Sequence, residues 1–93
     1  SNTYISEYIY LGMIEEKTED RYRITQKNKF CVGDRIEIMK PDGRNVPVIV
    51  LSLTTAEGER VESAPHPQQI LYVELDGEAD RYDLLRMKKD SNQ

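Results

Sequence analysis

The chain has 93 residues, of which 32% are charged, and a net charge of −4. This length allows one small domain and leaves no room for a separate catalytic one. The acidic balance argues against broad electrostatic attachment to nucleic acid, which needs clustered Lys and Arg. Because no apolar run approaches the ~20 residues of a membrane helix, and no signal peptide is visible, we expect no membrane partner.

Cys31 is the single cysteine of the chain. One thiol forms no internal disulfide and cannot assemble a thiolate metal cluster, so we expect a reducing, cytoplasmic setting and no cofactor in this fragment. Ser1-Asn2 resembles the remnant of a cleaved tag, and we therefore expect a piece of a longer protein. Residues 1–7 are predicted to be a flexible lead-in, residues 8–89 a single domain, and residues 90–93 a tail.

Alternating residues predict a first strand from Tyr8 to Ile14, with a bulge or a close backbone approach at Gly12. One face of this strand is predicted to hold Ile9, Leu11 and Met13, and the other face Tyr8, Tyr10 and Ile14. Residues 15–20 form an exposed connection. Residues 21–26 then predict a second strand that pairs with the first as a hairpin.

The stretch from Asn28 to Gly43 organises the middle of the chain. Gly33-Asp34 predicts a turn, because Gly accepts positive φ and Asp can hydrogen-bond its own backbone. From Arg35 to Ile38, two isoleucines alternate with two charged residues, as in a strand with one wet face. The Lys-Pro-Asp-Gly run at residues 40–43 then predicts a hairpin turn into the next strand.

The run from Val46 to Leu53 is the most apolar of the chain and predicts a strand, with Pro47 near its start or on an unpaired edge. Its alternation places Val46, Val48 and Val50 on one face and Ile49, Leu51 and Leu53 on the other. Because a small barrel buries only one face, the second apolar face indicates a cover. That cover is either the domain's own loops or a neighbouring domain.

The remaining chain predicts a very short strand at residues 60–62, a rigid irregular connection at residues 64–69, and two longer strands. Ile70 to Leu75 is one of them, with Leu71, Val73 and Leu75 on its core side. Asp83 to Met87 is the last, favoured over one helical turn because a strand here completes the sheet. Turn-separated strands without a clear helix predict an all-β fold, namely a small closed or nearly closed antiparallel β-barrel of about six strands.

A nucleophilic site would need Cys31 as thiolate, His66 as base and an acid such as Asp34 to orient the imidazole. Nothing in their spacing supports this arrangement, since free cysteine is commonly buried and His66 lies between prolines in a loop. The chain also lacks a zinc-ligand pair and a Gly-rich phosphate loop. We therefore predict no catalytic residue and no metal site in this fragment.

A basic stretch offers a binding role instead. Residues 20–44 carry seven basic and four acidic side chains, whereas residues 45–80 carry one basic and seven acidic. Within the basic stretch, Tyr22 together with Arg21, Arg23, Lys27 and Lys29 is a candidate stacking platform for single-stranded RNA. Solvated charge scattered over a barrel surface is the alternative interpretation.

Four segments, in this order, resemble the C-terminal domain of the U32 peptidase family, the collagenase-like proteases: Asn28-Lys29-Phe30, Gly33 to Ile38, Pro41-Asp42-Gly43 and Ala64 to Gln69. Tyr82 to Arg86 resembles the end of that domain. The likeness covers most of residues 8–89 and implies a compact β-barrel attached to a larger N-terminal catalytic region. Family members are described as peptidases, and some are linked to hydroxylation of RNA bases or quinone precursors, using iron–sulfur clusters held by cysteines elsewhere.

A looser likeness to the second-domain barrel of translation factors implies an accessory role. The leading hypothesis is a noncatalytic barrel of a U32-type hydrolase that packs on the catalytic region of the same chain or helps bind a macromolecular, collagen-like substrate. The alternative is an RNA-binding barrel of a U32-type RNA-modifying enzyme. The candidate binding residues lie on the rigid loop and at the entry to the third strand, and they are Asn28, Lys29, Phe30, Arg35, His66, Gln68 and Gln69.

Overall fold

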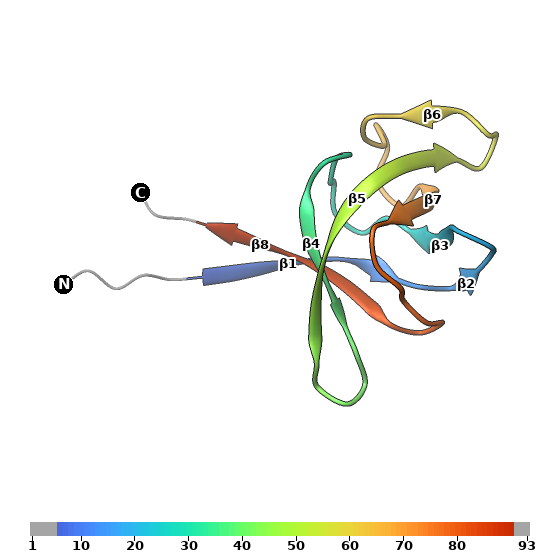
Figure 1. Cartoon of the computed structure of the whole chain (residues 1–93). Coiled ribbons are helices and arrows are strands. Elements are labelled where there is room, and N and C mark those ends of the chain that lie inside the picture. Colours follow the sequence, from blue (N-terminus) through green and yellow to red (C-terminus); the bar gives the residue numbers. More distant parts are fainter. Residues whose placement is uncertain (1–5, 91–93) are drawn as a thin grey trace.

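The computed structural model describes residues 6–90 and consists of antiparallel strands joined by turns (Figure 1). The strands are β1 (Ser6–Met13), β2 (Glu16–Lys17), β3 (Tyr22–Thr25), β4 (Arg35–Met39), β5 (Asn45–Thr55), β6 (Arg60–Val61), β7 (Ile70–Leu75) and β8 (Leu84–Asp90). The described residues contain no helix, and hence none that could cross a membrane. The predicted all-β class is confirmed.

The strands form one sheet that curls until its two ends nearly meet. Neighbouring strands follow the order β1-β8-β4-β5-β7-β3-β2, with β6 paired to β5. The end strands β1 and β2 are consecutive in the chain, separated only by Ile14 and Glu15. The Glu15 amide donates to the Arg23 carbonyl at 2.8 Å, and the Lys27 amide donates to the Leu11 carbonyl at 2.9 Å. These bonds join the first segment to the opposite end of the sheet, so the predicted nearly closed barrel is confirmed.

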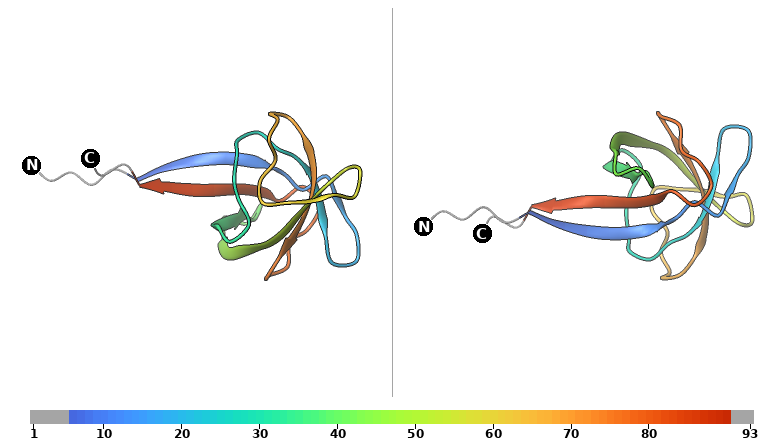
Figure 2. Two further views of the ribbon diagram at one scale, coloured as in Figure 1. Left: turned by 90° about the horizontal axis from the view of Figure 1, so that it is seen from above. Right: turned by 90° about the horizontal axis from the view of Figure 1, so that it is seen from below.

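Strands β1 and β8 continue beyond the barrel as a two-stranded arm, which projects from the body in all three views (Figures 1 and 2). Their register runs from Ser6↔Asp90 to Tyr10↔Arg86, whereas β4 reaches β8 no farther out than Glu37↔Arg86. Part of the expected lead-in and tail therefore belongs to strands. Residues 1–5 and 91–93 lie outside the described part of the chain.

The core fills the barrel and comes from every long strand and several loops. Its members are Leu11, Ile14, Tyr22, Ile24, Phe30, Ile36, Ile38, Val48, Val50, Leu53, Ala64, Leu71, Val73, Leu75, Ala79 and Leu85. Ile36 and Ile38 are both 0% exposed, as the alternation in β4 predicted. The predicted turns on either side of β4 are also confirmed, because the Asp34 carboxylate accepts the Cys31 amide at 2.8 Å and the Gly43 amide donates to the Lys40 carbonyl at 3.0 Å.

Two bulges change which residues face the core. The predicted bulge in β1 lies between Tyr10 and Gly12 and shifts the alternation by one residue. Ile14, predicted on the face of the tyrosines, is therefore buried in the core. A second bulge in β5, between Val50 and Ser52, turns Leu53 inward although the alternation had placed it beside Leu51. The prediction of one continuous second apolar face along β5 is wrong for this reason.

The partner of the second predicted strand is also different. Strand β3 pairs with the two-residue β2 and with β7, while β1 pairs with β8 from the other end of the chain. The predicted hairpin between the first two long strands is therefore wrong. Local sequence predicts the turn between β2 and β3. Strand β1, however, pairs along its length with β8, which lies more than 70 residues away. The alternation of residues within β1 does not indicate which strand is its partner.

Candidate nucleic-acid interface

The structure brings five of the seven predicted binding residues to one side of the barrel. Asn28, Lys29 and His66 line a groove of about 250 Å³ between the segment after β3 and the loop before β7. Gln68 and Gln69 line a neighbouring depression that shares His66. The predicted proximity of the Asn28 entry and the proline loop is therefore seen in the structure.

Most polar groups of this groove are already used within the domain. The Asn28 amide donates to the Tyr10 carbonyl at 2.7 Å, and the Lys27 ammonium donates to Gln68 Oε1 at 2.9 Å. Gln26 Nε2 donates to the His66 carbonyl at 3.2 Å, while its buried Oε1 has no partner among the described residues. The bonds of Gln26, Lys27 and Asn28 therefore fix the loop and the β1 bulge.

The other two predicted residues lie elsewhere. Phe30 is 1% exposed and belongs to the core, so it shapes the barrel and offers no surface to a partner. Arg35 begins β4 and lines a separate depression together with Pro47 and Lys88.

The stacking platform predicted around Tyr22 is not formed. Tyr22 is 5% exposed, and its hydroxyl accepts a hydrogen bond from the Ala79 amide at 3.0 Å. Its neighbour Arg23 is paired with Glu15, Nε to Oε1, at 3.2 Å. A buried ring cannot stack on a base, so the aromatic part of that prediction is wrong.

Exposed aromatic residues occur instead on β1, beside cations of β8 and β4. Tyr8 is 45% exposed and Tyr10 is 43% exposed. The register places Tyr8 opposite Lys88 and Tyr10 opposite Arg86, and Arg86 lies opposite Glu37 on β4. Directly paired residues project to the same side of a sheet, so these side chains share one surface with Arg35, two residues before Glu37. We call Tyr8, Tyr10, Arg35, Arg86 and Lys88 the aromatic–basic face.

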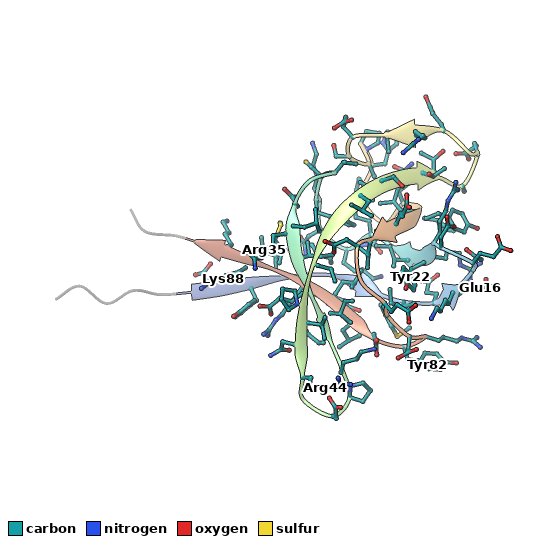
Figure 3. The ribbon with its side chains drawn as sticks, viewed as in Figure 1. Glu16, Tyr22, Arg35, Arg44, Tyr82 and Lys88 are labelled. Carbon is teal, nitrogen blue, oxygen red and sulfur yellow. The ribbon has the colours of Figure 1, made fainter. Side chains whose placement is uncertain are left out.

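Charge and stacking are organised on this face. The Arg86 guanidinium lies 3.7 Å from the centroid of the Tyr8 ring, and its Nε is 2.9 Å from Glu37 Oε1. Arg35 and Lys88 line one depression of about 400 Å³, and they lie near each other in Figure 3. Three cations lie on this face with the Glu37 carboxylate, and Asp76 lines a neighbouring depression with Arg35, on a chain with a net charge of −4. Such a surface can attract phosphates and stack planar groups.

The base of β8 is fixed to the β4–β5 hairpin by an ion cluster. Lys40 Nζ lies 2.6 Å from Asp83 Oδ2 and 2.8 Å from Asp80 Oδ2, and the Asp83 side chain is 2% exposed. Hydrogen bonds to Asp80 and to Asp83 raise the pKa of Lys40 above its ordinary 10.5. The hydrogen bond between Lys40 and Asp80, and next the positive charge of Lys40, lower the pKa of Asp80 below its ordinary 3.8. This cluster holds the loop from which β8 leaves toward the arm.

The residues present do not fit an iron–sulfur cluster or another metal centre. Cys31 is half-buried and has a free thiol, and its backbone forms an isolated β-bridge with Ser63. Among the described residues, no group of three or more His, Cys, Asp and Glu side chains gathers around a common point. Some family members are linked to an iron–sulfur cluster, and the described residues of this chain supply no set of ligands for one.

The fold and this face define a small, nearly closed β-barrel domain with a projecting two-stranded arm. A family model described as "Peptidase family U32 C-terminal domain" matches residues 6–86. The chain therefore belongs to the U32 C-terminal domain family, and the resemblance seen in the sequence is confirmed.

Solved structures of related proteins support the fold. The C-terminal domain of a Geobacillus thermoleovorans protein described as a U32 peptidase superposes with a TM-score of 0.74 at 20% identity, over 87% of this chain and 92% of that one. Its selenomethionine variant gives a TM-score of 0.68 at 22% identity, over 86% and 98% of the two chains. At these identities the likeness establishes the shared fold.

A curated relative is named tRNA hydroxylation protein P1, from Bacillus subtilis (strain 168). It is 30% identical over an alignment of 71 residues, and the match covers 74% of this chain. The chain spans 17% of the length of this relative.

The aromatic–basic face was missed because its members come from the two ends of the sequence. The Tyr8-x-Tyr10 and Arg86-x-Lys88 spacings each place two side chains on one face of a strand. This signal was visible, but combining the two pairs requires knowing that β1 pairs with β8.

Proposed function

We propose that this domain binds the RNA substrate of a U32-family tRNA-modifying enzyme and leaves the chemistry to another part of that enzyme. The observation that carries the proposal is the aromatic–basic face on an exposed arm of an acidic domain. Cations concentrated on one face supply the electrostatic attraction, and exposed tyrosines supply a surface for bases. The name of the Bacillus subtilis relative supports tRNA as the kind of RNA.

A barrel that presents a collagen-like protein substrate to a peptidase is the competing interpretation, supported by the description of the Geobacillus relatives. The structure offers a physical reason to favour RNA. Lys88 lies opposite Tyr8 on the same face as Tyr10, Arg35 lines one depression with Lys88, and phosphates next to bases match that combination. RNA binding also has a property that peptide binding to a neutral groove lacks, namely a steep dependence on salt.

The test is a titration of this chain with tRNA at about 50 mM and about 200 mM salt, with affinity followed by fluorescence anisotropy. If Arg35 and Lys88 contact phosphates of a single strand, the slope of log K against log salt should be about −1.4. The affinity should therefore fall roughly sevenfold over this range. The double variant Arg35→Ala and Lys88→Ala should bring the slope close to zero.

A matched control removes two exposed cations that lie outside the face. Arg21→Ala combined with Arg60→Ala changes the net charge by the same amount and should leave the slope near the wild-type value. No binding at about 50 mM salt, or an equal loss in both double variants, would refute a specific role for the face.

A second role, docking of the domain onto the catalytic region of its own protein, is favoured by one further observation. Leu51 is 45% exposed and lines a groove of about 230 Å³ with the half-buried Val32 and Val61. The sequence predicted that either the domain's own loops or a neighbouring domain would cover the face of β5 that carries Leu51. The loops leave Leu51 exposed. A U32 N-terminal region is the proposed occupant, because the chain spans only 17% of its curated relative.

For this docking role, we expect Leu51→Asp to abolish binding of the isotope-labelled domain to the separately produced N-terminal region of the same protein. Ile70→Asp is the matched control, since Ile70 is 40% exposed on a different depression. Retained binding in the Leu51→Asp variant would exclude this groove as the docking site.

A further inference from the structure

We infer that the aromatic–basic face binds unpaired nucleotides, so that the domain recognises a loop or another single-stranded part of its RNA and not a duplex. This inference rests on the proposed RNA-binding function and specifies the substrate for it. It follows from the spacing of the two tyrosines, from the different state of each ring and from the shape of the arm.

The spacing of the rings fits separated bases. Tyr8 and Tyr10 are two residues apart on one strand, and the bulge begins only after Tyr10. Their backbone positions are therefore about 6.7 Å apart. This is about twice the rise of 3.4 Å per nucleotide along one strand of duplex DNA, and hence much more than the distance between stacked bases. Neighbouring nucleotides must unstack before each can reach one ring, and unpaired segments do this at the lowest cost.

The two rings are in different states. One side of the Tyr8 ring is covered by the Arg86 guanidinium, which is held in turn by Glu37. Tyr10 is 43% exposed, and among the described residues no cation lies over its ring. Tyr10 therefore offers an open aromatic surface for a base, while the Tyr8–Arg86 pair forms a rigid wall beside it. Planar rings and guanidinium groups are the usual stacking partners of unpaired bases in RNA.

The backbone of Tyr10 is also held in a defined place. The bulge that follows it is fixed by the Asn28 side chain, which donates to the Tyr10 carbonyl at 2.7 Å. A base that stacks on a ring with a fixed backbone orders less of the protein when it binds. The predicted binding residue Asn28 thus acquires a positioning role, through the backbone of Tyr10.

The arm and the cations complete the match to a single strand. Beyond Glu37↔Arg86 the two strands of the arm pair only with each other and project from the body (Figure 2), and Tyr8 on this part is 45% exposed. Arg35 and Lys88 lie on the same face and can follow the phosphates of a strand whose bases lie on the tyrosines. The major groove of an RNA duplex is too deep and narrow for side chains to read, so a duplex would use the cations alone.

The experiment compares two RNAs of equal length and charge, one a hairpin with an unpaired loop and the other a blunt duplex without a loop. Wild-type protein should bind the loop RNA at least about tenfold more tightly at one fixed salt concentration. Tyr10→Leu should weaken loop binding about tenfold and leave duplex binding unchanged, whereas Tyr10→Phe should retain it. Tyr82→Leu is the matched control, because Tyr82 is 60% exposed but lies away from the arm (Figure 3), and it should bind as wild type.

The outcomes separate this inference from the function on which it rests. Equal binding of loop and duplex, with no effect of Tyr10→Leu, would overturn the inference and leave salt-dependent RNA binding intact. Absence of binding to either RNA at about 50 mM salt would overturn both. A loss of binding in Tyr82→Leu equal to that in Tyr10→Leu would place the stacking site elsewhere and would also overturn the inference.

Discussion

Replacement of Gly12 by alanine is expected to lower the free energy of unfolding by about 3 kcal/mol. A Cβ at this position would lie 2.8 Å from the Thr25 carbonyl oxygen, closer than such atoms approach in folded proteins, and the backbone φ is +149°. The obstacle is backbone, which cannot move aside like the end of a long side chain. Gly12 is therefore the residue that lets β1 cross the end of β3 and close the barrel.

Chemical denaturation of the variant, followed by circular dichroism, measures this effect, and for a domain of this size ~3 kcal/mol corresponds to a fall in Tm of roughly 15 °C. Gly43→Ala is the matched control, because Gly43 also has positive φ, +94°, but a Cβ there meets nothing within 4 Å. It should cost about 1 kcal/mol, from the backbone conformation alone. Equal losses in the two variants would show that the close approach to Thr25 has no energetic role.

Lys40→Met is expected to cost about 3 kcal/mol of unfolding free energy at neutral pH. The variant leaves the Asp83 carboxylate, 2% exposed, without the cation that lies 2.6 Å away. A buried charge without its partner loses the attraction and keeps the cost of leaving water. Arg44→Met breaks the exposed pair with Asp42 on the same hairpin and should cost much less than Lys40→Met, since solvent screens that pair.

The effect of Lys40→Met should also depend on pH. The pKa of Lys40 is raised in the folded state, so its contribution is complete below the ordinary value of 10.5 and is lost as the pH rises through the raised value. The pKa of Asp80 is lowered, so its contribution is complete above 3.8 and is lost as the pH falls through the lowered value. Unfolding measured from pH 3 to pH 11 should therefore show the largest difference between wild type and variant in the middle of this range. A difference that stays constant to alkaline pH would contradict the role of the ammonium.

The parts of the fold that depend on neighbouring residues could be predicted from the sequence. The Gly33-Asp34 turn, the alternation of β4 and the core side of β7 follow from local chemistry, and the structure confirms each of them. The connection at residues 64–69, which contains two prolines, also lacks regular secondary structure, as predicted. Family resemblance added the barrel, because several short motifs in one order are more specific than any single pattern.

The parts that depend on distant pairing could not be predicted. A bulge moves every later residue of a strand to the opposite face, which explains the errors at Ile14 and Leu53. The stacking platform around Tyr22 was predicted wrongly because it was also judged from local sequence alone. Tyr22 lies among basic residues in the sequence, but its ring is buried in the core. The basic residues of β8 that share a face with Tyr10 lie 70 or more residues later in the chain.

The most direct test of the central claim, that the face on β1, β8 and β4 binds RNA, is an NMR titration of this isotope-labelled chain with tRNA. We expect the largest chemical-shift changes at Tyr8, Tyr10, Arg35, Arg86 and Lys88, and we expect them to weaken as salt is added. Changes confined to the groove of Asn28, Lys29 and His66, or no changes at low salt, would contradict it.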